Sequence, residues 1–455
     1  MEAFNPKGSL SAVALRAGRQ IVARMLLCWG GAVALSGCAA KAPEHEGSFS
    51  TFSRSEEEVQ DPAPIETLAD FLANEVLAEG KIPGITLAIA QHGELVFARG
   101  YGQADVELEV PVDLETVYRA NAITQQFTAA LILRLVEAGK LSLDDPITQY
   151  LPEFPTQDHQ VTLRHLLSHT SGIGKDLTIG QSSVDQAGLQ QEFPLERIVE
   201  RFKTLPFRFS PGEQSEPNSM GYYLLGIIIG RVTGIPYAYY LEQELLQPLG
   251  LSHTRYEYDQ RIIPDRAKGY TFSGNQLLNA PYASAQAEGA AGALCSTAED
   301  LVRWTYLLHS GQVVSQASLQ QMMAPTVLIT GDTVGYGYGI YLDELARHPK
   351  VYQEGSSAGF GAYLSHYPAD GLTIAILTNS GLGKEKAAEI EELLACEILR
   401  VPAPSQQLTV QTMNLTEQAA YANPASPECT ELSELQRATF LIESGDNGRK
   451  VRPRY

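Results

Sequence analysis

The stretch YRANAITQQFTAALILRLVEAGKLSLDDPITQYLPEF, residues 118–154, decides the fold, because it contains a helix that is apolar on nearly every side. Eight of the ten residues from Phe127 to Val136 are apolar, which predicts a helix surrounded by protein. The backbone N–H groups that begin such a helix point into the protein, where they stabilise negative charge. The residues just before Phe127 are therefore the first place to look for chemistry.

The segments on either side of this helix predict a sheet built from both ends of the chain. Apolar residues recur at three- and four-residue steps in residues 65–76, which predicts a helix with one buried stripe. Turn residues between apolar runs predict two hairpins, at residues 84–102 and 362–378, and residues 384–399 predict a second amphipathic helix. We therefore predict an α/β fold, in which an antiparallel sheet is flanked by N- and C-terminal helices and carries a large, mostly helical insertion.

The composition is that of a folded protein of ordinary polarity. The chain has 455 residues, of which 44% are hydrophobic and 19% charged, and these values argue against intrinsic disorder and against a polytopic membrane protein. The formal net charge is -20, so most of the surface repels phosphate. This charge excludes nucleic acid as the main partner.

The N-terminus has the pattern of an exported bacterial protein. Basic residues precede a short apolar run, which is followed by LSGC, a string that resembles the lipobox of bacterial lipoproteins. We predict that residues 1–37 are a lipoprotein signal peptide and that lipid on Cys38 attaches the mature chain to a membrane. Ala39 replaces the aspartate that commonly retains lipoproteins in the inner membrane, which favours the outer membrane of the cell envelope. An ordinary signal peptide with a chance cysteine is the alternative.

Composition also divides the rest of the chain. Residues 38–64 are polar, acidic and flanked by proline, which predicts a flexible linker. Residues 65–400 hold the folded domain. Residues 401–455 begin with a linker-like VPAPSQQ and then have few apolar repeats, so their structure is left uncertain.

The cysteines and histidines predict neither a metal nor a cofactor. Outside the signal and Cys38, three cysteines remain, an odd number without metal-ligand spacing: Cys295, Cys396 and Cys429. His165 and His169 lie four residues apart, but no glutamate follows the first as in zinc peptidases. We interpret these histidines as part of a packed junction between a helix and a turn.

Several blocks in the middle and at the end of the chain carry a family resemblance. The blocks are residues 118–154, TLRHLLSHTSGI, PGEQSEPNSMGYYLLGIIIGRVTGIPY, GAAGALCSTAEDLVRW, VGYGYGI and SSAGFGAYLSHYPADGLTIAILTNS. Their sequence and order resemble the beta-lactamase and penicillin-binding-protein-like serine hydrolases, in the branch of class C beta-lactamases, D-alanyl-D-alanine carboxypeptidases and esterases. The resemblance covers about residues 65–400. It implies the sheet-and-helix fold above and hydrolysis through an acylated serine.

The first motif of that family is a serine three residues before a lysine, at the start of the buried helix. One helical turn brings the lysine amine beside the serine hydroxyl, where it helps to remove the proton. Alignment on the buried helix places Ala122 at the serine and Gln125 at the lysine. The chain contains no Ser-x-x-Lys at any position, so no shift of the alignment restores the pair.

The second and third motifs of the family depart in the same way. In the Tyr-x-Asn motif, Pro217 stands at the tyrosine and Ser219 at the asparagine; a one-residue slip keeps Asn218 but still removes the tyrosine. In the third motif, a histidine or lysine two residues before a glycine, Gln353 replaces the basic residue and Gly355 remains. The proton-carrying side chains are therefore replaced in all three motifs.

These replacements favour a catalytically inactive pseudo-hydrolase. In another serine hydrolase, loss of the nucleophile or its base lowers turnover roughly a million-fold. We expect such a protein to bind a cell-wall peptide fragment or a protein partner, and Asn218, Gly355 and Tyr118 are candidates for the lining of a ligand pocket.

An active serine hydrolase with a displaced nucleophile is the competing hypothesis, as a beta-lactamase, a carboxypeptidase or an esterase. Ser357 lies in a Gly-x-Ser-x-Gly string, residues 355–359, and Ser219 is the other nearby serine. A nucleophile elbow needs a strand before the serine and a helix after it, whereas the sequence here predicts a hairpin. We therefore favour a tight turn at Ser357.

Overall fold

The computed structural model describes residues 64–174 and 195–403. The predicted signal peptide, Cys38 with its lipid, nearly all of the predicted linker, Cys429 and most of the C-terminal extension lie outside these residues.

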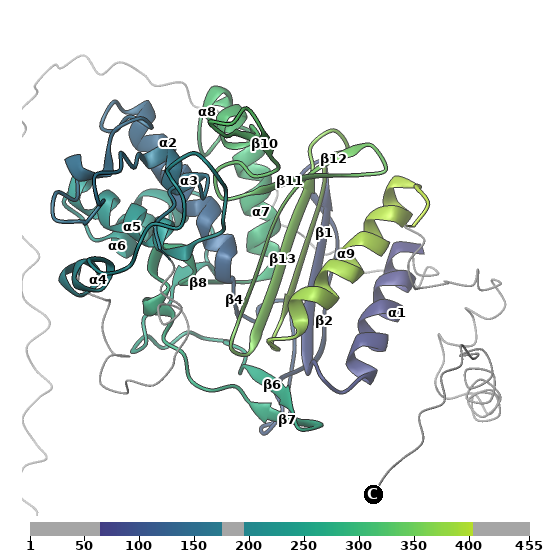
Figure 1. Ribbon diagram of the computed structural model, residues 1–455. Coiled ribbons are helices and arrows are strands. Elements are labelled where there is room, and N and C mark those ends of the chain that lie inside the picture. Colours follow the sequence, from purple (N-terminus) through teal and green to yellow (C-terminus); the bar gives the residue numbers. More distant parts are fainter. Residues whose placement is uncertain (1–63, 175–194, 404–455) are drawn as a thin grey trace, which may run out of the picture. The chain divides into compact units, whose positions relative to one another are not determined.

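A seven-stranded antiparallel sheet organises the described residues (Figure 1). The strands follow one another across it in the order β11 (Tyr341–Leu345), β12 (His348–Ser357), β13 (Phe360–Tyr367), β14 (Leu372–Thr378), β1 (Gly84–Gln91), β2 (Glu94–Asp105) and β3 (Val110–Pro111). Strands β1 and β14 are neighbours, with Leu87 opposite Ile376. The two ends of the folded chain therefore meet in the middle of the sheet, as the sequence predicts.

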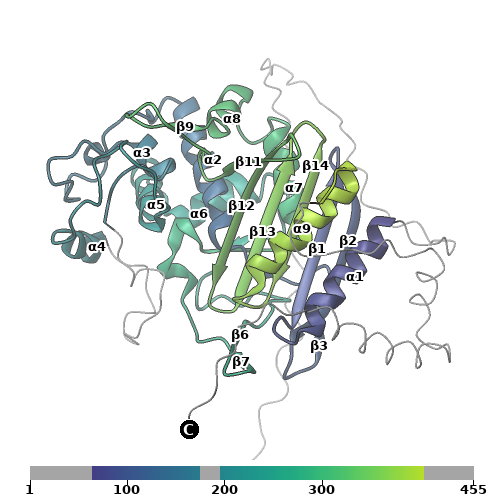
Figure 2. The ribbon, with the colours of Figure 1, turned by 45° about the vertical axis from the view of Figure 1, so that its right-hand side comes forward.

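Helices cover both faces of this sheet. Helices α1 (Pro64–Ala78) and α9 (Gly383–Leu399) lie side by side on one face, and α7 (Ala298–His309) lies on the other (Figures 1 and 2). Because side chains alternate along a strand, β1 sends Leu87 towards α1 and α9 and the smaller Ala88 towards the helical region. Every residue of β13 and β14 is buried, as expected for strands covered on both faces.

The insertion is mostly helical. It contains α2 (Thr124–Glu137), α3 (Leu163–Leu167), α4 (Leu195–Phe202), α5 (Ser219–Thr233), α6 (Tyr237–Leu241), a π-helical turn (Glu242–Leu246) and α8 (Gln316–Met322). Its short strands are β4 (Tyr118–Arg119), β5 (Arg255–Tyr256), β6 (Tyr270–Ser273), β7 (Gln276–Asn279), β8 (Leu294–Ser296), β9 (Thr326–Val327) and β10 (Thr333–Val334). Single 3-10 turns are η1 (Asn121–Ile123), η2 (Ile147–Gln149), η4 (Ala285–Ala287) and η5 (Gly289–Ala291).

Helix α2 is enclosed as its composition predicts. Phe127 stacks on Trp304 of α7 with ring centroids 3.8 Å apart, and the Trp304 indole donates to the Gln126 side chain at 3.0 Å. The two predicted hairpins and the two predicted terminal helices are all present, so the predicted fold class is confirmed. Within the described part of the chain, no single helix is long and apolar enough to cross a bilayer; α5 and the segment 237–246 meet that test only together, with a bend of 79°.

Candidate active site

The start of α2 is held against the sheet at the place where the family motifs converge. β4 leads into η1, where Asn121 adopts a left-handed backbone with φ of 50°, and the half-buried Ala122 follows. A side-chain carbon at Gly355 of β12 would lie only 2.6 Å from the backbone nitrogen of Ala122. Glycine is therefore required at 355, because the strand backbone touches the beginning of the helix.

Gln125 is fixed by donors that come from distant parts of the chain. Its side chain is 5% exposed, and its Oε1 accepts a hydrogen bond from the Tyr336 hydroxyl at 3.1 Å. The same oxygen lies 3.2 Å from Nε2 of His169. Gln353, from the third motif, donates through Nε2 to the Gly339 carbonyl at 2.9 Å and to the Tyr336 hydroxyl at 3.4 Å. We call Gln125, His169, Tyr336 and Gln353 the cleft cluster.

The hydrogen bonds of the cleft cluster define its proton positions. The backbone N–H of Asn218 donates to Nδ1 of His169 at 3.3 Å, so the proton of a neutral His169 resides on Nε2 and is donated to Gln125. Burial raises the pKa of Tyr336 far above its usual value, so its hydroxyl keeps its proton. In this arrangement the cluster is neutral, and both ring nitrogens of His169 are engaged.

The loop of the second motif has become a helix cap. Asn218 is the N-cap of α5 and accepts from the Met220 N–H at 3.0 Å, while its Nδ2 donates to the Ile173 carbonyl at 2.8 Å. These bonds engage the Asn218 amide in structure, although we had proposed it as a pocket residue. Pro217 and Ser219 are exposed, and neither places a titratable group at this wall.

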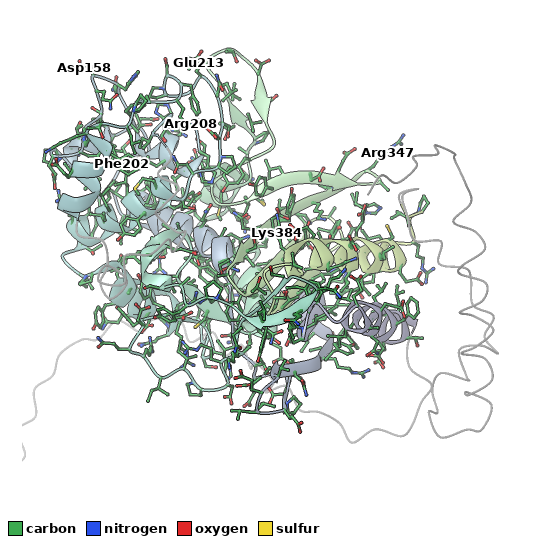
Figure 3. The ribbon with its side chains drawn as sticks, turned by 60° about the horizontal axis from the view of Figure 1, so that its bottom comes forward. Asp158, Phe202, Arg208, Glu213, Arg347 and Lys384 are labelled. Carbon is green, nitrogen blue, oxygen red and sulfur yellow. The ribbon has the colours of Figure 1, made fainter. Side chains whose placement is uncertain are left out.

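The alternative alignment of this loop also leaves no free acid. Glu216, which takes the tyrosine position after a one-residue slip, accepts from Nε of Arg208 at 2.5 Å. Figure 3 shows Arg208 and Glu213 in the segment that precedes α5.

Ser357 does not lie on a nucleophile elbow. It is the last residue of β12, and a turn at Gly359, with φ of 86°, leads directly into β13 instead of a helix. Its hydroxyl oxygen is buried and has no hydrogen-bond partner among the described residues. A base that would activate this hydroxyl is therefore not bonded to it in the described part of the chain.

One candidate pocket residue is corrected by the structure. Tyr118 is fully buried, and its hydroxyl accepts from the Thr86 side chain at 3.0 Å, under the sheet. It packs in the core, because the short strand β4 directs it inward, and does not line an open pocket. Gly355, in contrast, does lie at the start of α2 as expected.

A charged group lies beside the cleft cluster on the same short strand. Arg119 donates to both carboxylate oxygens of the buried Glu257, at 2.7 and 3.0 Å, and its guanidinium lies 5.7 Å from the centre of the Phe360 ring. Burial raises the pKa of the nearby Glu288 to about 7. The cleft therefore has one carboxyl group that titrates near neutrality.

The two histidines of the HLLSH string have separate roles. His165 closes a capping box at the start of α3, with the Thr162 N–H donating to its Nδ1 at 3.2 Å, whereas His169 belongs to the cleft cluster. In the described ranges, no three His, Cys, Asp or Glu residues gather in a way that could hold a metal ion.

Sequence reasoning missed the partners of Gln125. Tyr336 is 211 residues away from Gln125, in a block that we used only for the resemblance. His169 was considered only as a metal ligand. Neither residue has a local signal for its role, because the contact with Gln125 exists only in the folded chain.

Known proteins connect this geometry with a family. The family model described as Beta-lactamase matches residues 67–397. The chain belongs to the beta-lactamase family. Esterase EstB of Burkholderia gladioli is 34% identical over 202 residues, which make up 42% of this chain and 51% of the esterase. Protein flp of Staphylococcus aureus MRSA252 is 26% identical over 72% of this chain and 66% of its own length. The chain thus spans half to two thirds of these relatives.

Solved structures of the beta-lactamase family agree with the fold. The octameric penicillin-binding protein homologue from Pyrococcus abyssi matches with a TM-score of 0.65 and 28% identity, over 75% of this chain and 79% of that one. The D-amino acid amidase from Ochrobactrum anthropi SV3, complexed with L-phenylalanine, matches with a TM-score of 0.64 and 23% identity, over 74% and 99% of the two chains. The amidase likeness concerns the fold alone.

Proposed function

We propose that this member of the beta-lactamase family is catalytically inactive and binds a cell-wall peptide-like ligand, or a protein partner, as a lipid-anchored protein of the cell envelope. One observation carries the proposal. Ala122 and Gln125 stand where the family has its nucleophile and its base, and Gln125 is bonded into a neutral cluster with His169 and Tyr336.

The arrangement leaves no route to an acylated enzyme at this position. A methyl group cannot form an ester, and a glutamine amide cannot remove a proton at neutral pH. Residual turnover after loss of a nucleophile in another serine hydrolase is only about 10^3 to 10^4 above water. The cleft cluster engages its own polar groups, so binding is the function that remains.

The backbone of the site favours a carbonyl-containing ligand. The contact between Gly355 and Ala122 keeps the edge of β12 against the first N–H groups of α2, which attract partial negative charge. Relatives are named as an esterase and a penicillin-binding protein, and a structural neighbour as an amidase. Esters, lactams and amides share a carbonyl group, and this supports a peptide-like ligand.

Covalent labelling tests the inactive state. The purified chain is incubated with a fluorescent penicillin and with a fluorophosphonate, and penicillin-binding protein 4* of Bacillus subtilis serves as the positive control. We expect labelling of the control and none of this protein. Stoichiometric labelling, or steady turnover of a chromogenic cephalosporin by contaminant-free protein, would contradict the proposal.

The competing hypothesis of a displaced nucleophile rests on the unpartnered hydroxyl of Ser357. It predicts labelling that disappears in Ser357→Ala and persists in Ser219→Ala. Loss of the label only in Ser219→Ala would move the nucleophile to the start of α5.

Ligand binding is tested by thermal shift with purified muropeptides. Bound ligand raises the melting temperature in proportion to its affinity for the folded state. Ala122→Trp is the matched variant, because a large side chain at this half-buried position fills the entrance of the cleft. A shift that is lost in Ala122→Trp supports cleft binding; no shift in either protein favours a protein partner.

Membrane attachment is tested separately on the whole chain. Metabolic labelling with a palmitate analogue should mark the wild type and not Cys38→Ser, and fractionation should place the labelled protein in the outer membrane. Soluble, unlabelled wild-type protein would overturn lipid anchoring and leave the proposal for the cleft unaffected.

A further inference from the structure

A second cavity lies in the helical region, away from the cleft. Its volume is about 340 Å³, and it is lined by the π-helical turn Glu242–Leu246, the loop that follows, and Arg255 and Arg261. No residue of the cleft cluster lines it. An activity or ligand of the cleft therefore does not account for this cavity.

The two arginines of the cavity differ in how their charge is balanced. Arg261 is paired with Glu242 at 2.5 Å. Arg255 forms no ion pair with the described residues; it donates one hydrogen bond to the Ser252 carbonyl at 2.9 Å. Its Nε–H is buried, and in the described part of the chain this group has no hydrogen-bond acceptor. One positive charge in the cavity is thus uncompensated.

An unbalanced arginine is unusual in a protein of this charge. Acidic residues outnumber basic ones by 53 to 33, so a carboxylate partner could easily have been placed beside Arg255. A buried donor without a partner costs about 1–3 kcal/mol. Such a group is expected to have a role that the protein alone does not show, such as a bound anion or water.

The backbone and the apolar wall define the rest of the cavity. The π-helical turn is a widened turn of a kind that often occurs at functional sites. Leu246 and Leu251 are 2% and 3% exposed and form an apolar side opposite the arginines' polar surroundings. A ligand that matches this cavity combines one negative charge with a small apolar group.

We propose that this cavity binds a small organic carboxylate, with the carboxylate on the guanidinium of Arg255 and the apolar part against Leu246 and Leu251. The planar guanidinium matches a carboxylate in a two-point contact. Two arginines and one glutamate give the lining a formal charge of +1, which suits a monoanion better than phosphate. This site is independent of the function proposed for the cleft.

Isothermal titration with butyrate, acetyl-alanine and inorganic phosphate tests the site in the full-length chain. We expect both carboxylates to bind with millimolar or tighter affinity and phosphate to bind more weakly. Arg255→Met should weaken carboxylate binding at least tenfold, which corresponds to about 1.4 kcal/mol. Arg255→Lys keeps the charge but not the planar fork, so its affinity should lie between the two. Ala122→Trp should bind butyrate like the wild type.

A second variant protects the test against misfolding. Gln247 is exposed and lines the cavity, so Gln247→Trp should fill it without disturbing the core and should abolish butyrate binding. Melting curves establish that each variant is folded. The proposal is wrong if neither carboxylate binds at about 20 mM, where a millimolar ligand would raise the melting temperature. Equal binding by wild type, Arg255→Met and Gln247→Trp, or binding of phosphate alone, would also overturn it.

Discussion

Strand β12 carries a buried polar cluster on each of its faces, and the two clusters differ in charge. Towards α9, Lys350 donates to Glu391 at 2.6 Å. Towards α2, Gln353 joins the neutral cleft cluster. Lys350 is 9% exposed and Gln353 is 2% exposed, so both clusters are removed from water. Burial by itself therefore does not explain why one cluster is charged and the other neutral.

The charged cluster is fully bonded by its surroundings. The carboxylate of Glu391 also accepts from the Ser365 hydroxyl at 2.7 Å and from the Tyr367 hydroxyl at 2.8 Å. The ammonium of Lys350 lies 5.2 to 5.8 Å from the centres of three tyrosine rings, which attract cations: Tyr352, Tyr363 and Tyr367. A buried ion pair is tolerated when its remaining hydrogen-bonding groups are satisfied in this way.

The same alternation continues along the strand. Glu354, the residue after Gln353, faces α9 and accepts from Lys384, which Figure 3 shows at the start of that helix, at 2.9 Å. Charged side chains thus persist on the face that only holds α9. On the face where the family performs chemistry, neutral side chains have replaced them. Loss of catalysis removes the reason to keep a costly buried charge in the cleft, whereas α9 still needs its attachment.

The largest expected effect comes from breaking the charged cluster. Lys350→Met removes the cation and leaves the Glu391 carboxylate buried without its partner, so the free energy of unfolding should fall by about 3–5 kcal/mol. The double variant with Glu391→Leu should recover most of this loss, because neither charge remains. Urea denaturation measures both. A loss below about 1 kcal/mol in Lys350→Met would show that the cluster is not a structural ion pair.

The neutral cluster can be challenged in the opposite direction. Gln125→Lys introduces an ammonium group where His169 and Tyr336 both present donors, so we expect a loss of roughly 2–4 kcal/mol at pH 7. Gln125→Met is the matched control, since it leaves the same two donors unsatisfied without adding charge, and should lose about 1–3 kcal/mol. Chemical denaturation compares the two variants.

The pH dependence separates charge from shape in this pair. A buried lysine is expected to have a lowered pKa, so below about pH 10 the unfolded chain binds more protons than the folded one. The stability of Gln125→Lys should therefore rise with pH relative to Gln125→Met. Equal stability of the two variants at pH 7 and pH 10 would mean that the cleft accepts a cation.

These two clusters also show how far a sequence can be interpreted. The strands and terminal helices were predictable because Leu87 and its neighbours, or Ile390 and Leu394 of α9, repeat with the period of their element. The departures at Ala122, Gln125 and Gln353 were visible because the family resemblance fixes their positions. Periodicity and alignment are both local signals, and they suffice for elements and motif positions.

Contacts between distant residues could not be predicted in this way. Lys350 precedes β12's apolar residues in a segment that has the composition of an exposed hairpin, and its partner Glu391 is 41 residues away. Tyr118 is a residue type that occurs both in cores and in pockets, and only the direction of β4 decides between them. The uncompensated charge of Arg255 is likewise a property of the folded protein alone.

A third buried polar pair on the same sheet should titrate. His366 of β13 and His309 of α7 have ring centroids 4.0 Å apart, and burial lowers their pKa values to about 4 and about 3. Because the folded pKa is depressed, the unfolded chain binds more protons below pH 6.5, and stability should fall as the pH drops from there. At pH 5 the loss is about 2 kcal/mol for each histidine.

Denaturation at pH 7 and pH 5 measures this effect. His309→Gln should show about half of the wild-type pH dependence between these values, because one histidine remains. An unchanged dependence would place the titrating groups elsewhere, for example at Glu288, whose raised pKa gives the opposite sign.

The smallest expected effect comes from an ion pair on α9 itself. Lys386 lies 3.0 Å from Glu389 and 3.1 Å from Glu79, with side chains that are 32%, 54% and 36% exposed. The partners match those of Lys350 in chemistry and in distance, and the helix is the one that holds Glu391, so burial is the main difference. Water screens the exposed pairs, and Lys386→Gln should therefore change the free energy of unfolding by only about 0.3–1 kcal/mol. The change should vanish in about 1 M salt, whereas that of Lys350→Met should persist, because buried pairs are screened much less. A salt-resistant loss of more than about 2 kcal/mol in Lys386→Gln would mean that attachment of α9, and not burial, sets the contribution of a charge on this face.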